Sequence, residues 1–172
     1  GALVMAKKIL VVDDSALMRR VICDIINSDE RFQVTGRAVD GLQAFDLLIM
    51  HSYDAVVLDV NMPRMTGLEL LKELRKYRIP ARVMMASTDT REGAKTTLDA
   101  LELGALDFIH KPDNAAQCRG GSFPDHLLRI LDAVSGSSVS VLETEPAKSR
   151  ESAQTTSKVV ELVKKSPSRT AG

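Results

Sequence analysis

The chain has 172 residues, and its 23 basic side chains are balanced by 23 acidic ones, which argues against a general nucleic-acid or anionic-membrane binder. It contains two Tyr, four Phe and no Trp, so it lacks the rings on which single-stranded nucleic acid stacks. This length suits one domain with a tail. No apolar run approaches the ~20 residues that a membrane-spanning helix needs.

The two cysteines are isolated from each other in the sequence. Cys23 lies in an apolar periodic segment and Cys118 in a Gly-containing loop, which predicts neither a disulfide framework nor a zinc site. A reducing cytoplasm is therefore the expected compartment. Residues 1–5 are interpreted as a leader, since Gly1–Val4 are too few for a signal peptide and Met5 is a natural start.

Apolar runs of strand length alternate with segments of helical periodicity along the chain. Strands are predicted at 7–12, 32–37, 54–58, 82–86 and 106–109. Each is followed by a helix whose apolar residues are, in turn, Leu17, Val21 and Ile25 with Met18, Ile22 and Ile26; Leu42, Phe45, Leu48 and Ile49; Leu70, Leu71 and Leu74; Ala94, Leu98 and Leu101; and Leu127, Ile130, Leu131 and Val134. The set in the fourth helix is expected to face inward.

Five strand–helix units predict an α/β fold with helices on both faces of a parallel sheet. The expected fold is a doubly wound five-stranded parallel sheet of strand order 2-1-3-4-5, the order of flavodoxin and CheY. We assign residues 6–135 to this domain. Residues 136–172 are rich in Ser, Thr, Lys, Glu and Pro and are expected to form a flexible linker, with one apolar cluster at 159–163.

Polar side chains end four of the five predicted strands. Asp13 and Asp14 follow the first, Asp59 the third, Ser87 the fourth and Lys111 the fifth. Ligands of open α/β sheets collect at the carboxyl edge of the strands, so these side chains are expected to converge on one pocket. Crowded carboxylates raise one another's pKa, and a divalent cation relieves the repulsion. An all-oxygen site suits Mg²⁺.

The same set of residues suits phosphoryl transfer. A carboxylate beside Mg²⁺ can accept a phosphoryl group, while Lys111 supplies a fixed cation to its oxygens and Ser87 a hydrogen bond. Taken singly, the residues have plainer interpretations. Asp13 and Asp14 could cap a helix, Ser87 could lie in a turn, and Lys111 could be a solvated loop lysine.

Four motifs together resemble the signature of response-regulator receiver domains over about residues 7–134. They are Val12-Asp13-Asp14-Ser15, Leu58-Asp59-Val60-Asn61-Met62-Pro63, Ser87 and Lys111-Pro112. By that resemblance Asp59 is the phosphoacceptor. Mg²⁺ would be bound by the carboxylates of Asp14 and Asp59, by the backbone carbonyl of Asn61, and by Asp13 through water.

The resemblance also implies a switch. Lys111 would orient the phosphoryl group before a cis Pro112, Ser87 would be the switch hydroxyl, and Phe108 occupies the aromatic switch position. Drawing Ser87 inward would vacate space for Phe108 and change the surface of the fourth helix, the fifth strand and the last helix.

Segments 15–20 and 101–112 resemble the receiver of chemotaxis protein-glutamate methylesterases, the CheB family. That family continues into an esterase domain, which does not fit in the remaining residues. We therefore expect a receiver and linker from a longer protein, with no enzyme activity of its own. The implied partners are a chemotaxis-type histidine kinase as phosphodonor and an output domain, attached or separate. No direct nucleic-acid or membrane partner is expected.

Three alternatives share parts of this pattern. A stand-alone receiver, or one from a DNA-binding response regulator, would have the same pocket. An Asp-nucleophile phosphohydrolase would need a second acid two residues after Asp59, where Asn61 stands. A flavin-binding module of the same strand order would have its phosphate repelled by the clustered acids.

Overall fold

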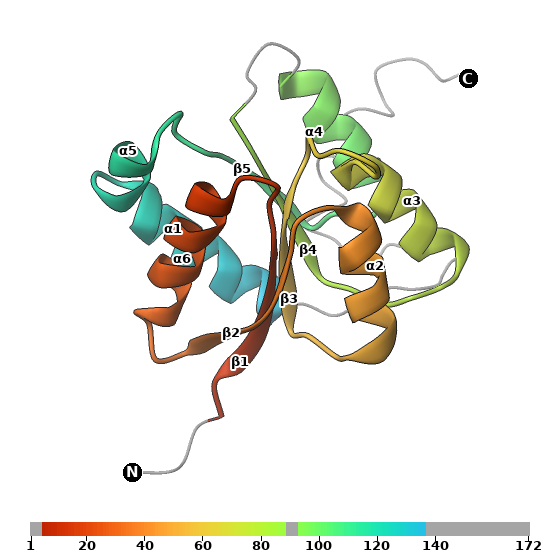
Figure 1. Cartoon of the computed structure of the whole chain (residues 1–172), viewed down its shortest axis with the longest axis horizontal. Helices are drawn as coiled ribbons and strands as arrows, with labels where there is room; N and C mark the ends of the chain where they lie inside the picture. Colours follow the sequence, from red (N-terminus) through yellow and green to blue (C-terminus); the bar gives the residue numbers. More distant parts are fainter. Residues whose placement is uncertain (1–4, 89–92, 137–172) are drawn as a thin grey trace, which may run out of the picture. The chain divides into compact units, whose positions relative to one another are not determined.

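Five parallel strands form the centre of the protein, as seen in a computed structural model that describes residues 5–88 and 93–136. The strands are β1 (Lys7–Val12), β2 (Phe32–Ala38), β3 (Ala55–Asp59), β4 (Val83–Ser87) and β5 (Asp107–His110). They lie in the order β2-β1-β3-β4-β5, and every neighbouring pair is parallel (Figure 1). This confirms the predicted fold. The predicted linker at 136–172 and its apolar cluster lie almost wholly outside the described residues.

Helices cover both faces of the sheet. They are α1 (Ala16–Asn27), α2 (Gly41–Met50), α3 (Gly67–Lys76), α4 (Gly93–Glu102), α5 (Ala115–Arg119) and α6 (Phe123–Ser135). On one face lie α1, α5 and α6, and on the other lie α2, α3 and α4 (Figure 1). None of the helices in this described part is long and apolar enough to cross a membrane.

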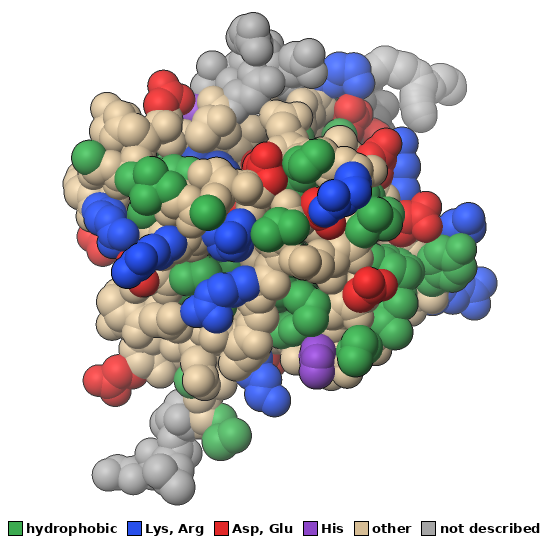
Figure 2. All heavy atoms as spheres, in the orientation of Figure 1, with side chains coloured by type: hydrophobic (Ala, Val, Ile, Leu, Met, Phe, Trp, Pro, Cys, Tyr) green, Lys and Arg blue, Asp and Glu red, His purple; other side chains and the backbone are tan. Residues whose placement is uncertain are grey.

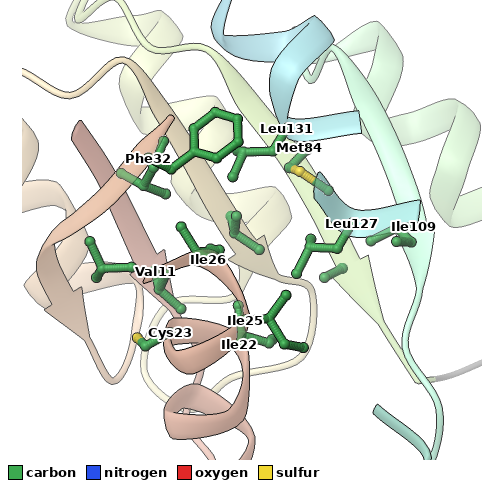
Figure 3. Packing of buried hydrophobic residues seen from close by; sticks show 14 of the residues in the cluster. Val11, Ile22, Cys23, Ile25, Ile26, Phe32, Met84, Ile109, Leu127 and Leu131 are labelled. Carbon is green, nitrogen blue, oxygen red and sulfur yellow. The ribbon is translucent and has the colours of Figure 1, made fainter. Parts of the chain in front are cut away.

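Alternation along the strands divides the core into two clusters. In β1, Ile9 and Val11 face the layer of α1, α5 and α6, whereas Leu10 and Val12 face the layer of α2, α3 and α4. Figure 3 shows the first cluster, where side chains from α1 and α6 meet those of the strands. Both free cysteines, Cys23 and Cys118, are buried in it, as expected for a chain without a disulfide.

The apolar residues that mark three of the predicted helices are not all buried. Leu17 of α1 is 59% exposed, and α2 exposes Leu42 and Ile49. Hydrophobic side chains accordingly gather over α2 and α3 on the surface in Figure 2. In α4 the residue that is fully buried is Ala100, while Leu98 is 38% exposed. Ala94, also predicted inward in α4, is exposed as well.

Small residues explain which faces of α2 and α4 are buried. Where a helix lies close to its neighbours, Ala44 and Ala100 fill the space that a larger side chain would overfill. In α2, a Cβ added to Gly41 would lie 2.6 Å from the carbonyl oxygen of Met65. The larger apolar residues Leu42, Ile49 and Leu98 therefore lie at the exposed margin of the helix–sheet contact. The periodicity of the sequence alone does not reveal this.

The expectation of a loop around Cys118 was wrong, because this residue lies in the short helix α5. Asn114 caps this helix by accepting a hydrogen bond of 2.9 Å from the backbone N–H of Gln117. The helix buries Cys118 against the α1–α6 layer. This part of the connection between β5 and α6 is thus a packed helix.

Gly67 should tolerate no side chain, because an added Cβ would collide with the carbonyl oxygen of Asp59 and lie 3.0 Å from the Cε of Met85. We expect Gly67→Ala to lower the free energy of unfolding by about 1–3 kcal/mol, the usual cost of overpacking. Urea denaturation measures this change. Gly93→Ala is the control, since nothing lies within 4 Å of its added Cβ. Equal stability of both variants would contradict the prediction.

Candidate functional site

The acidic residues meet where β1 and β3 end. Val12 pairs with Leu58, so the next residues, Asp13 and Asp59, lie beside each other on the side of the sheet that α1 covers. Ligand oxygens of Asp13, Asp14 and Asp59 all lie within 4.8 Å of one another. Asp13 and Asp59 are buried and Asp14 is exposed, so the cluster opens to solvent at one side.

Lys111 joins this cluster from the end of β5, the strand at one edge of the sheet. Its Nζ lies 2.6 Å from Oδ2 of Asp13 and 3.5 Å from Oδ1 of Asp59. The residue is 3% exposed, so the interpretation as a solvated loop lysine is wrong. Its backbone N–H donates a 2.8 Å hydrogen bond to the carbonyl of Ser87, which fixes the end of β5 against β4.

The expectation of a cis Pro112 was also wrong. No peptide bond among residues 5–88 and 93–136 is cis. The contacts of the Lys111 ammonium with Asp13 and Asp59 are therefore made with a trans bond to Pro112.

Local hydrogen bonds hold Asp13 in place. One of its carboxylate oxygens accepts a 2.9 Å bond from the N–H of Ser15, and its carbonyl accepts a 2.7 Å bond from the guanidinium of Arg19. The N-cap of α1 is Ser15, whose hydroxyl accepts from the N–H of Met18. The plainer interpretation of Asp13 and Asp14 as the helix cap is therefore wrong. Sequence reasoning missed Arg19, and its spacing from Asp13 carries no signal.

The loop after Asp59 is closed by its own backbone. The N–H of Gly67 donates a 2.8 Å bond to the carbonyl of Val60, and Thr66 forms a capping box with Glu69 at the start of α3. Asn61 lies exposed in this loop, two residues after the cluster. The expected contribution of its carbonyl to a cation site stays a prediction.

Ser87 and Phe108 belong to the opposite side of the sheet. Met85 pairs with Phe108, and alternation along β4 turns Ser87 to the same side. Phe108 is half-buried and packs against the cluster beneath α2, α3 and α4, while Ser87 is buried at the strand end. Their switch roles stay predictions.

Burial and like charge together raise the pKa of Asp59 to about 7. Loss of solvent is the largest cause, the positive charge of Lys111 acts against it, and the charges of Asp13 and Asp14 raise the pKa further. A site of three clustered carboxylates suits a hard divalent cation with oxygen ligands such as Mg²⁺.

Comparison with known proteins identifies the family. The sequence model of the family described as "Response regulator receiver domain" matches residues 9–119 of this chain. The chain belongs to this family. It is also 38% identical to the response regulator domain of *Thermotoga maritima* CheB, with a TM-score of 0.68, over 78% of this chain and 99% of that one. The receiver assigned from the motifs is thus of the CheB type.

Two further proteins extend this comparison. The receiver is 47% identical over 121 residues to a protein-glutamate methylesterase/protein-glutamine glutaminase of *Pyrococcus horikoshii*. That alignment covers 70% of this chain and 33% of the relative, so the chain spans about a third of its length. A chain of the CheX-CheY-BeF3-Mg+2 complex from Borrelia burgdorferi is 30% identical, with a TM-score of 0.61 over 74% of this chain and 88% of that one.

The raised pKa of Asp59 predicts a pH effect on stability in EDTA. From about pH 4 to about pH 7 the folded state keeps a proton that the unfolded chain has lost. The free energy of unfolding should therefore fall over this range, by at most about 1.4 kcal/mol per pH unit from this group.

In Asp59→Asn this contribution is absent. The difference in free energy of unfolding between wild type and variant, measured by urea denaturation from pH 5 to 8, should change with pH and level off above 7. The exposed Asp46 offers the control variant Asp46→Asn, which should run parallel to wild type. Parallel curves for wild type and Asp59→Asn would contradict the prediction.

Proposed function

We propose that this receiver accepts a phosphoryl group on Asp59 from a chemotaxis-type histidine kinase, in a reaction that depends on Mg²⁺. The observation that carries the proposal is the meeting of three carboxylates with the buried Lys111 at the carboxyl ends of β1, β3 and β5. Receiver domains generally bind Mg²⁺ in such an acidic pocket, and the *Borrelia burgdorferi* CheY complex contains Mg and BeF3.

In the reaction, a carboxylate oxygen of Asp59 attacks phosphorus as the bond from phosphorus to the histidine nitrogen of the donor breaks. Asp59 must be ionised to attack, and the charge of Lys111 favours that form. When bound by the carboxylates of Asp14 and Asp59, by the carbonyl of Asn61 and, through water, by Asp13, Mg²⁺ would neutralise charge on the phosphoryl oxygens. The ammonium of Lys111, held by Asp13, is close enough to Asp59 to meet another of these oxygens.

Phosphorylation then changes the surface through Ser87 and Phe108. The hydroxyl of Ser87 moves to donate a hydrogen bond to the phosphoryl group on Asp59. The ring of Phe108 then moves into the space that Ser87 has left. The places of both residues on one side of β4 and β5 support this coupling. The affected face comprises α4, β5 and α6.

The output controlled by this face is a methylesterase-like domain of the longer protein. The CheB-type receiver and the share of the *Pyrococcus horikoshii* relative that the chain spans support this part of the proposal. A stand-alone receiver, or one from a DNA-binding response regulator, remains the alternative.

Incubation with acetyl phosphate and Mg²⁺, followed by intact mass, tests the phosphoryl acceptor. We expect one phosphoryl adduct on wild type and on Asp46→Asn, because Asp46 lies exposed on α2, away from the cluster. We expect none on Asp59→Asn and none in EDTA, because the nucleophile or the cation is missing.

Two results would contradict the proposal. Incorporation by Asp59→Asn at the wild-type rate would place the acceptor elsewhere. No adduct on wild type, with Mg²⁺ binding shown by calorimetry, would leave a receiver-shaped domain that binds the cation without accepting the phosphoryl group.

A further inference from the structure

The turn between β2 and α2, residues 38–41, is bonded to both loops that carry the acidic cluster. The carbonyl of Ala38 accepts a 3.1 Å hydrogen bond from the N–H of Asp13. The N–H of Gly41 donates a 3.1 Å bond to the carbonyl of Met65 in the loop after Asp59. The turn therefore contacts the end of β1 at Asp13 and the loop after β3 at Met65, although it contributes no ligand to the site.

An ion pair strengthens the second of these links. Asp40 is 1% exposed, and its Oδ2 is in short contact with the guanidinium of Arg64. Arg64 lies three residues after Asn61 and has a φ of +66°, which is uncommon for a residue with a side chain. Exposed ion pairs usually contribute little, but here one partner is buried and fixed.

Asp40 is fixed because its other oxygen caps α2. Oδ1 accepts a 2.9 Å bond from the N–H of Gln43, and the side chain of Gln43 in turn accepts from the N–H of Val39. The turn is thus rigid before it meets the loop. The carboxylate of Asp40 holds the guanidinium of Arg64, and the N–H of Gly41 holds the carbonyl of Met65. Both holding groups are already fixed by the turn.

We propose that Asp40 and Arg64 are positioning residues that set the distance between the β1 acids, Asp13 and Asp14, and the loop that carries Asn61. Neither touches the phosphoryl group or the cation. They act by holding the loop from residue 60 to 66, so that its carbonyl ligand is in place before the cation arrives. The inference rests on the proposed function, because it assigns these residues to the same cation site.

The chain offers variants that separate this role from stability. Asp40→Asn keeps an acceptor for the N–H of Gln43, since Asn caps helices as well as Asp, but removes the charge that Arg64 meets. Arg64→Asn removes the guanidinium and tolerates the positive φ. Arg64→Lys keeps the charge. Arg31→Ala removes ion pairs with Asp29 and Asp132 just before β2, at the opposite end of the strand from the turn.

Mg²⁺ titration by calorimetry, well below the melting temperature of each protein, measures the effect. We expect Asp40→Asn and Arg64→Asn each to weaken Mg²⁺ binding about tenfold, as loss of a residue that holds a ligand commonly does. The double variant should be no weaker than either single one, because both remove one interaction. Arg64→Lys should stay near wild type, and Arg31→Ala should match it.

Hydrogen exchange in EDTA gives a second readout that needs no cation. The amide of Gly41 should exchange faster in Asp40→Asn and Arg64→Asn than in wild type, because its bond to Met65 loses support. Wild-type Mg²⁺ affinity in both variants would overturn the inference, even with a lower melting temperature. If wild type itself binds no Mg²⁺, the proposed function is overturned and this inference with it.

Discussion

The buried contact between Lys111 and Asp13 permits the concentration of negative charge on which the site depends. Two of the three clustered carboxylates are almost wholly removed from water, and burial of an unpaired carboxylate is costly. Lys111 compensates only in part, since the pKa of Asp59 remains raised. The carboxylate cluster at the carboxyl ends of β1 and β3 thus carries more negative charge than Lys111 neutralises. A bound cation would be stabilised there by this excess charge.

The strand order determines which side chains can take part. Since β1 and β3 are neighbours, short aspartates suffice to bring their carboxylates together. Two strands separate β5 from β1, so a residue at its end must have a long side chain to reach Asp13. Lysine has both the length and the charge, and it lies 98 positions after Asp13 in the sequence.

Strand positions and the residues at strand ends could be predicted because the signal is local. A β-branched run followed by acids shows both the strand and its carboxyl end, and the parallel order then brings Asp13 beside Asp59. Helix faces were less predictable, since the close packing of Ala44 and Ala100 depends on the distance to other elements. The contacts of Arg19 and Arg64 join residues without a fixed spacing, so no pattern in the sequence indicates them. The short helix α5 was not predicted, because a run of five residues followed by Gly120 and Gly121 is typical of a loop.

Because both thiols lie on one face of the sheet, thiol chemistry can distinguish the two hydrophobic clusters of the core. Cys23 and Cys118 both lie in the cluster covered by α1, α5 and α6, and the cluster on the other face contains no cysteine. Burial raises the pKa of both thiols, so neither reacts readily while that layer stays closed. While the rest of the protein stays folded, the rate of alkylation by a thiol reagent therefore reports the opening of the layer of α1, α5 and α6. The native protein carries a built-in probe of its local unfolding on the α1–α6 side, without any added label.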